Sequence, residues 1–238
     1  PDETAVRLRE SGIMRLLQPR DFSGLEATPM DWFRSVLEVG LHSGSAAWVC
    51  GVVGVHPFEI ALGTRQLQEE IWGSDPDTWV ASPYAPFGRA RPVEGGYLFN
   101  GRWPWSTGTS HCEWAVLGGL ITDQEGTPLP HDQGTRHFFL PKTDYTTLPD
   151  EWDIAGLSGT GSFDVVVKDA FIPDHRVIDP RDLESGAAAA QAGRSDSALY
   201  RMPFNLMFSG TIAAGALAIA RGGLESFIAY SRVRPKLW

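Results

Sequence analysis

Apolar residues recur at helical spacing over the first third of the chain. Residues 32–41 carry Trp32, Phe33 and Val36 on one helical face, behind a Thr28-Pro29 start typical of a helix N-terminus. Residues 46–55 are apolar on all sides, which is typical of a helix buried on most faces. We expect that helix to end at His56, because proline at position 57 disfavours helical geometry in the residue before it. Residues 1–73 are therefore predicted to form a helical domain.

The pattern changes in residues 74–182, where turn signals alternate with short apolar runs. Pairs such as Gly95-Gly96 and Asn100-Gly101 separate runs rich in aromatic and branched residues, among them 114–116, 137–140 and 163–167. Short strands with turn signals at this spacing predict an antiparallel barrel or sandwich.

A third zone begins with small residues and ends in one long apolar helix. Residues 183–203 are predicted to form a mobile surface loop. Residues 204–238 are assigned to the first helix of a second helical domain. Within them, residues 208–230 are predicted to be helical, and Arg234-Pro235 is predicted to break the helix. Glycines at 210, 215, 222 and 223 would let another helix approach closely. A lone apolar helix cannot bury itself, so a partner subunit or further helices must cover it. The fold class predicted from these zones is α+β.

Composition narrows the function classes. The 238 residues include 20 basic and 29 acidic side chains, giving a net charge of −9, which argues against nucleic-acid partners and an anionic membrane surface. Residues 46–55 are too short to cross a bilayer, and no secretion leader is visible. Cys50 and Cys112 make neither a disulfide framework nor a zinc site, and the histidines lack metal-ligand spacing. A cytoplasmic protein without a metal is predicted.

The most unusual segment runs from Trp103 to His111. Two indoles precede Ser106, Thr107 and a glycine, and hydroxyls can bond the edge of a heteroaromatic ring while indoles wall its face. Glycine at 108 would let the backbone approach a ligand. The structural alternative is a strand-to-turn junction with core tryptophans, and spacing alone favours it.

Three other positions have both a structural and a functional interpretation. His56 is more often a satisfied buried histidine, and its functional role would be to accept a proton near neutral pH. Ser82 precedes a proline and reads as a turn residue or as a donor to a ligand. The glycine-rich residues 156–162 could cradle a phosphate, although a tight turn is preferred. No dinucleotide, P-loop, zincin or nucleophile-elbow motif occurs.

Taken together, five segments in order resemble the acyl-CoA dehydrogenase superfamily, and within it the oxygenase components of two-component flavin-dependent aromatic hydroxylases. The segments span most of the chain, and five motifs in order are more specific than any one alone. They are Gly51-Val52-Val53-Gly54-Val55-His56, Ala81-Ser82-Pro83-Tyr84-Ala85-Pro86, Gly95-Gly96-Tyr97-Leu98-Phe99-Asn100-Gly101, Trp105-Ser106-Thr107-Gly108, and Gly159-Thr160-Gly161-Ser162 with Asp169-Ala170-Phe171-Ile172-Pro173.

The resemblance implies an architecture and a reaction. The family has an N-terminal helical domain, a central β-domain and a C-terminal helical bundle, assembled as a homotetramer. It uses reduced flavin, FMNH2 or FADH2, supplied by a separate flavin reductase. With O2 the flavin forms a C4a-hydroperoxide that hydroxylates a phenol ortho to its hydroxyl group. The implied substrate is a small phenolic molecule, with a steroid-derived phenol as one candidate.

The resemblance also implies residue roles on the flavin side. Ser106 and Thr107 would hydrogen-bond the flavin and protect the oxygenated intermediate, which gives both a catalytic role. Trp105 would pack against the flat face of the flavin ring, and Gly108 would lie beside that ring. Ser82 would line the pocket near the flavin or the substrate.

On the substrate side, the resemblance implies that His56 lies by the phenol and helps to form the more nucleophilic phenolate. Ser82 and Tyr84 would line the substrate pocket, and Tyr200 and Arg201 would close it. A water-poor cavity shared by His56 and the Trp105–Thr107 strand is the central expectation, since a reactive oxygen species decays in a wet site.

Some features depart from the family pattern. Ser158 stands where relatives often carry arginine, and Pro57-Phe58-Glu59 differs from the aromatic-histidine pattern of the steroid-hydroxylating members. Two alternatives therefore stay open. One is an acyl-CoA dehydrogenase-like oxidoreductase with tightly held FAD, although the acidic Glu-Pro-Gly-Ala-Gly-Ser pattern of dehydrogenases is missing from residues 82–88. The other is a non-catalytic scaffold.

Overall fold

The computed structural model describes residues 2–233. The capped and proline-started helix predicted after Thr28 is present: the Thr28 side chain accepts a hydrogen bond from the Asp31 backbone, and Pro29 opens the helix. The helices are α1 (Asp2–Ser11), α2 (Pro29–Gly40), α3 (Gly44–Val53), α4 (His56–Ile60), α5 (Arg65–Trp72), α6 (His131–Gly134), α7 (Pro180–Ser185), α8 (Ala187–Gln191) and α9 (Phe204–Val233).

The strands form one mostly antiparallel sheet that is not closed, so of the predicted barrel or sandwich the closed barrel is excluded. They are β1 (Val80–Ala81), β2 (Gly88–Val93), β3 (Gly96–Ser106), β4 (Trp114–Ile121), β5 (Thr135–Pro141), β6 (Thr146–Leu148), β7 (Phe163–Pro173) and β8 (Val177–Ile178). The order is β6-β7-β3-β2-β4-β5-β8, with β1 paired to β4. Pairing is antiparallel except where β4 meets β1 and β2. The sequence did not predict the parallel pairing of β2 with β4. Turn signals predict hairpins between consecutive strands, but they do not predict crossover connections.

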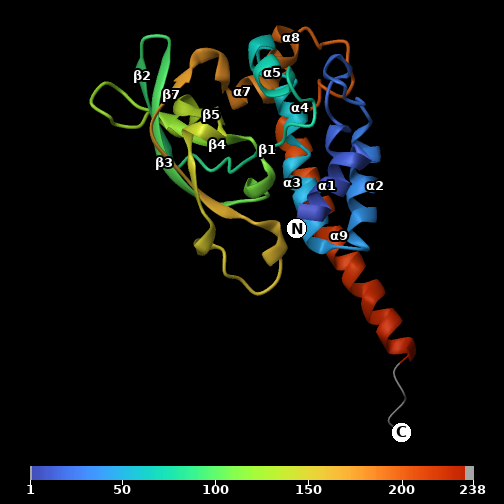
Figure 1. Cartoon of the computed structure of the whole chain (residues 1–238). Coiled ribbons are helices and arrows are strands. Elements are labelled where there is room, and N and C mark those ends of the chain that lie inside the picture. The colour runs from blue at the N-terminus through green and yellow to red at the C-terminus, as the bar shows by residue number, and fades with distance from the viewer. Residues whose placement is uncertain (1, 234–238) are drawn as a thin grey trace.

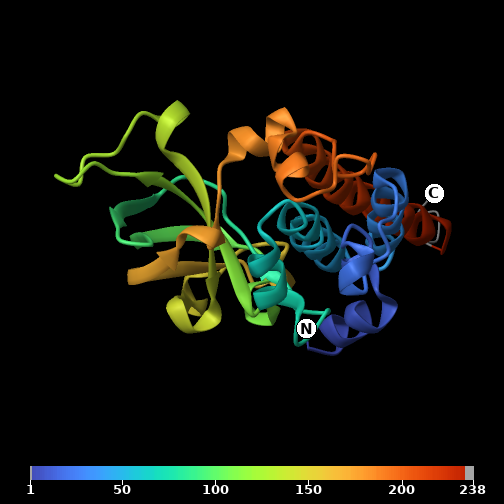
Figure 2. The same ribbon diagram turned by 90° about the horizontal axis from the view of Figure 1, so that it is seen from above.

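The helices pack on one side of the sheet, as Figures 1 and 2 show from two directions. Alternate residues of each central strand face opposite ways. In β4 and β5, Val116 and Phe139 join the core shared with the helices, whereas Leu117 and Phe138 join a second core on the other face. One face of the sheet therefore packs against the helical layer, and the other face covers a separate core.

The buried apolar helix ends earlier than predicted, and His56 has a different position. Helix α3 stops at Val53, and His56 is the first residue of α4. Pro57 lies in the first turn of α4, where a proline removes no intrahelical hydrogen bond. The proline therefore starts the second helix instead of merely ending the first.

Helix α9 crosses α2 and α3 at close range through small residues. A Cβ added at Gly40 would lie 2.4 Å from the Ala218 Cβ, and one at Gly222 would lie 2.2 Å from the Gly40 carbonyl oxygen. The close contact predicted for the glycines holds at Gly210, which meets a phenyl ring, but not at Gly223, where a Cβ would meet nothing. The helix begins at residue 204, and the predicted break at 234–235 lies outside the described residues.

Beyond this crossing α9 extends away from the rest of the molecule (Figure 1). Leu224, Phe227 and Tyr230 are all more than half exposed there. By length and composition alone α9 could also span a membrane, a test that core helices of globular proteins pass as well. The expectation drawn from residues 46–55 overlooked this helix.

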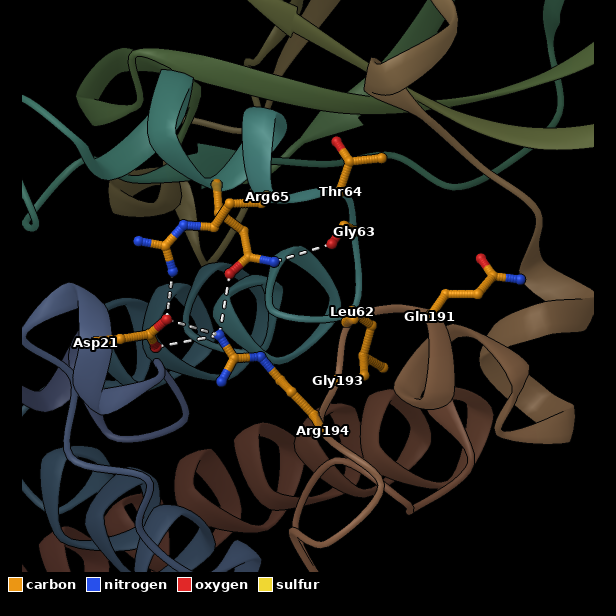
Figure 3. Close-up of a pocket in the computed structure, with 10 residues that line it drawn as sticks. Asp21, Leu62, Gly63, Thr64, Arg65, Gln191, Gly193 and Arg194 are labelled. Atoms are coloured by element: carbon orange, nitrogen blue, oxygen red, sulfur yellow. Dashed lines mark hydrogen bonds and ion pairs between the residues drawn. The ribbon is translucent and has the colours of Figure 1, made fainter.

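The segment predicted as a surface loop is partly helical. Helix α7 begins just before it, and α8 lies within it. Beyond α8, the Arg194 guanidinium donates to the Asp21 carboxylate at 3.1 Å and to Gln68 Oε1 at 3.1 Å, while its Nε donates to the Ala61 carbonyl at 2.9 Å (Figure 3). These bonds tie the segment to the N-terminal helices, and its mobility stays a prediction.

Candidate functional site

The end of strand β3 holds an unusual backbone. Trp105 has a φ of 64°, in the left-handed region that residues with a Cβ rarely occupy, and its side chain is 70% exposed. Pairing with β7 shifts register between Trp103 and Ser106. The Ser106 side chain points inward and is fully buried, yet its hydroxyl has no hydrogen-bond partner among the described residues. Backbone strain beside an orphaned buried hydroxyl is typical of a place where a ligand binds.

Thr107 fastens this strand end to helix α3. Its Oγ1 accepts a hydrogen bond from Trp48 Nε1 at 3.3 Å and lies 3.0 Å from the Ser162 hydroxyl, which in turn lies 2.8 Å from Thr160 Oγ1. Gly108 follows with a φ of 73°, and a Cβ there would lie 3.0 Å from a Val53 methyl. The Thr107 side chain is thus committed to the scaffold.

The two tryptophans of the motif have different roles. Trp103 is fully buried, and its Nε1 donates to the carbonyls of Ala85 at 3.1 Å and Gly118 at 2.8 Å. This matches the structural interpretation of a core tryptophan. Trp105 instead presents its indole to the surface, where it is free to cover a flat ring.

His56 belongs to a buried polar chain formed by α4, the segment after β1, and β5. Its Nδ1 lies 2.9 Å from the Tyr84 hydroxyl, and that hydroxyl donates to Glu59 Oε2. The other Glu59 oxygen, Oε1, accepts from His137 Nδ1 at 2.6 Å. His56 and Glu59 are fully buried, and His137 is 5% exposed. His56 Nε2 has no partner among the described residues.

Burial controls the protonation states in this chain. It lowers the pKa of His56 to about 3, with the charge of His137 adding to the effect. Burial also raises the pKa of Tyr84, and the nearby Glu59 charge raises it further. At neutral pH His56 is therefore a neutral imidazole and Tyr84 a neutral phenol. A neutral imidazole with one unpaired ring nitrogen can accept a hydrogen bond or a proton.

The other predicted residues fall into two groups. Ser82 follows β1 and is 5% exposed. Tyr200 is a core residue: its hydroxyl donates to the Leu17 carbonyl at 3.0 Å and its ring lies 5.9 Å from that of Phe58. Arg201 is exposed. The fold uses the Tyr200 hydroxyl, and the role of Tyr200 on the substrate side stays a prediction.

Glu59 and His137 are the polar residues that sequence reasoning missed. Glu59 is three residues after His56, so both lie on one face of α4, inside an otherwise apolar segment. His137 alternates with Phe139 on β5, which puts it on the face toward the helices. An acid in an apolar helix and a histidine in an apolar strand were the available signals.

Two hollows in the described residues lie away from this cluster. One of about 310 Å³ lies between α5 and α8 and is lined by Asp21, Arg65 and Arg194, whose charges pair with one another (Figure 3). The other, about 250 Å³, lies beside Ser45, Trp79 and Thr160. Neither His56 nor Ser106 lines these two hollows, so a shared cavity for both stays a prediction.

Curated proteins of similar sequence cover nearly the whole chain. A pigment production hydroxylase of Rhodococcus erythropolis is 45% identical over 94% of the chain. The oxygenase subunit HsaA of a flavin-dependent monooxygenase of Rhodococcus jostii is 37% identical over 98%, and the oxygenase component of p-hydroxyphenylacetate 3-hydroxylase of Acinetobacter baumannii is 31% identical over 100%. The chain spans 56%, 59% and 55% of these relatives, respectively. No family model matches the chain.

Solved structures agree with the sequence matches. The 3-HSA hydroxylase of Rhodococcus sp. RHA1 superposes on all of the chain, and on 61% of its own, with a TM-score of 0.92 and 36% identity. The chain is thus similar, over nearly all of its length, to the oxygenase components of flavin-dependent monooxygenases. XiaF of Streptomyces, solved with FADH2 and glycerol, superposes on all of the chain and 58% of its own, with a TM-score of 0.89 and 26% identity.

These superpositions confirm the predicted acyl-CoA dehydrogenase-like fold, with its helical and β parts. The match to crystallised enzymes supports a soluble protein. Within the described residues, no group of three or more His, Cys, Asp or Glu side chains could hold a metal ion.

Proposed function

We propose that the protein containing this chain is the oxygenase component of a two-component flavin-dependent monooxygenase that hydroxylates a phenol ortho to its hydroxyl group. The observation that carries the proposal is a pair of buried, orphaned polar atoms, His56 Nε2 and Ser106 Oγ. Buried polar atoms are almost always hydrogen-bonded. Other buried atoms, such as Trp32 Nε1 and Tyr145 OH, also lack a partner among the described residues, but His56 and Ser106 lie in the segments that resemble hydroxylases, where a missing ligand would supply the partner. The names of the relatives supply the reaction class.

The residues at the end of β3 fit a reduced flavin. The exposed indole of Trp105 offers a flat apolar wall, and the unpartnered Ser106 hydroxyl offers a hydrogen bond to the ring edge. Thr107 holds this strand against α3 through Trp48 and so fixes the position of Ser106. When bound, the reduced flavin supplies the electrons that activate O2 for transfer to the substrate. FADH2 is favoured over FMNH2 by its presence in XiaF.

On the substrate side, His56 acts on the phenol. Its neutral imidazole accepts the hydrogen of the phenol hydroxyl at Nε2, and a phenolate ring is a better nucleophile than a phenol ring. Tyr84 fixes the His56 ring through Nδ1. The aromatic rings of Phe204 and Phe208 pack edge-on to Tyr84 at 5.3 and 5.1 Å and keep water from this side. Ser82 and Arg201 are retained as proposed pocket residues.

The proposal includes partners and a location. A flavin reductase supplies the reduced flavin, as the names of two-component relatives suggest. The exposed apolar end of α9 fits burial against further helices or a second subunit, in line with a homotetramer. We propose a cytoplasmic protein, because Cys50 and Cys112 are both free.

The test is reconstitution of the reaction. Purified protein, a generic flavin reductase, NADH and isotopically labelled O2 are mixed with a panel of para-substituted phenols, and products are analysed by mass spectrometry. We expect a catechol that carries one labelled oxygen, formed only with the reductase present. A protein that instead purifies yellow and reduces a dye with an acyl thioester is a dehydrogenase. A protein that binds neither redox form of flavin is a scaffold, and either outcome overturns the proposal.

A further inference from the structure

We infer that Glu59 and His137 form the inner end of a proton relay, running through Tyr84, that sets His56 to take the proton of a phenol. The inference rests on the proposed function and deepens it, because it says where that proton goes. Glu59 and His137 act through Tyr84 and His56 and are therefore positioning residues.

The order of hydrogen bonds fixes which nitrogen of His56 is free. Tyr84 donates its hydrogen to Glu59 Oε2, so its oxygen has lone pairs left for His56. The close partner of that oxygen, His56 Nδ1 at 2.9 Å, must then be the donor. Neutral imidazole carries one hydrogen, so Nε2 is an acceptor with an unused lone pair. This is the nitrogen that has no partner among the described residues.

His137 fixes the other end of the chain. Its Nδ1 donates to Glu59 Oε1 at 2.6 Å, so both carboxylate oxygens accept and neither carries a hydrogen. Because Glu59 Oε1 is occupied by His137, Oε2 is the oxygen left for Tyr84. With both Glu59 oxygens accepting, the hydrogen bonds from His56, Tyr84 and His137 all point toward the Glu59 carboxylate.

The proton count balances through the chain. The phenol O–H bond breaks and its proton joins His56 Nε2, while the Nδ1 proton passes to the Tyr84 oxygen. The Tyr84 proton passes to Glu59 Oε2. The products are a phenolate, a neutral His56 with its hydrogen on Nε2, an unchanged Tyr84 and a neutral Glu59 acid still bonded to His137. The negative charge has moved from a buried carboxylate to the substrate, and His56 and Tyr84 both end neutral, as they began.

The surroundings favour a relay over a simple structural ion pair. The titratable groups facing one another here are His56 and Glu59 from α4, Tyr84 from the segment after β1 and His137 from β5, whereas α9 contributes only the rings of Phe204 and Phe208. A fully buried carboxylate is costly, and apolar packing would hold α4 to β5 as well. A second pair, Glu70 with His175 at 2.8 Å, lies partly exposed on α5 and serves as a matched control.

The first test reads the His56 tautomer directly, without flavin or substrate. Nitrogen-15 NMR of histidine side chains distinguishes the two neutral tautomers, and the His56 signals are assigned by their loss in His56→Gln. We expect hydrogen on Nδ1 in the unmodified protein, and a mixture or reversal in Tyr84→Phe. Hydrogen on Nε2 in the unmodified protein overturns the relay.

The second test reads the ionisation of a bound phenol. The probe is 4-nitrophenol, whose phenolate is yellow and whose phenol is not, titrated with pH in the protein without flavin. We expect the bound probe to ionise at lower pH than the free probe, and Glu59→Gln to raise its apparent pKa by about one unit, a tenfold loss in the ionisation equilibrium. His137→Asn should do the same more weakly, and Glu70→Gln should change nothing. Thermal melting checks that each variant is folded.

The outcomes separate the relay from the function. In one outcome the unmodified protein hydroxylates phenols, and folded Glu59→Gln and Tyr84→Phe variants bind the probe with the same apparent pKa as the unmodified protein. That outcome refutes the relay and leaves the proposed function standing. If the unmodified protein neither binds the probe nor hydroxylates any phenol, the proposed function is refuted and the relay with it.

Discussion

Replacement of Ser106 by alanine should stabilise the protein while it damages the proposed reaction. The Ser106 hydroxyl is fully buried and has no hydrogen-bond partner in the described residues. A buried polar group without a partner costs about 1–3 kcal/mol. Alanine removes that cost but leaves a small gap, so the free energy of unfolding should rise by about 1 kcal/mol.

Thr107→Val is the matched opposite case. Valine keeps the shape of threonine but removes the oxygen that pairs with Trp48 Nε1 and the Ser162 hydroxyl. The half-buried Trp48 indole then loses its partner and the buried Ser162 hydroxyl keeps only Thr160 among the described residues, so the free energy of unfolding should fall by about 1–3 kcal/mol. Two adjacent hydroxyl removals are thus expected to change stability with opposite sign.

The assay has two readouts. Urea unfolding followed by tryptophan fluorescence measures the stability of each variant, and the ratio of hydroxylated phenol to hydrogen peroxide released measures coupling. We expect Ser106→Ala to gain stability and to release more peroxide, because the proposed flavin contact is lost. A Ser106→Ala variant that loses as much stability as Thr107→Val would show that the hydroxyl is used by the fold. Unchanged coupling would remove Ser106 from the flavin site.

Four further predictions concern His56, the α9 crossing and the two cysteines. Because the pKa of His56 falls to about 3 on folding, the unfolded chain binds the extra proton, so stability should rise between pH 3 and about 6.5, and His56→Gln should flatten that rise in acid unfolding curves. His56→Ala should also lower phenol hydroxylation with flavin binding retained, as stopped-flow absorbance would show. Gly40→Ala should destabilise the α2–α9 contact by about 1–3 kcal/mol, whereas Gly223→Ala, in open space within a helix, should stabilise by about 0.5–1 kcal/mol, both read by thermal melting. Burial raises the pKa of Cys50 and of Cys112 to about 12, so neither thiol should react with a disulfide reagent until the chain unfolds.

The sequence predicted helices before Gly73 and strands after it because the apolar residues of the two parts follow different patterns. The helical spacing before Gly73 and the turn-bounded apolar runs after it are local patterns, and the folded protein forms the helices and strands that they predict. The parallel β2–β4 pairing and the position of His56 were missed for a common reason. Both depend on which segment comes next to which in space, and in particular Pro57 can end a helix or begin one.

The candidate site was only half visible in the sequence. Trp105 and Ser106 stand out as a motif, but their opposite orientations follow from a positive φ that no residue type announces. Glu59 and His137 are 78 positions apart and meet only when α4 packs on β5. The hydrogen bond from the Tyr200 hydroxyl to the Leu17 carbonyl joins residues 183 positions apart, so no local pattern in the sequence could have shown it.

The pairing of β3 with β7 has a consequence for synthesis of the protein. β3 is made early, but its second neighbour is residues 163–173, which emerge from the ribosome some sixty residues later. Until then a long strand edge with Phe99 and Trp103 lacks its cover, and such an edge invites pairing with other nascent chains. We expect fragments that stop before residue 163 to aggregate, and slow translation across residues 107–162 to increase the need for chaperones.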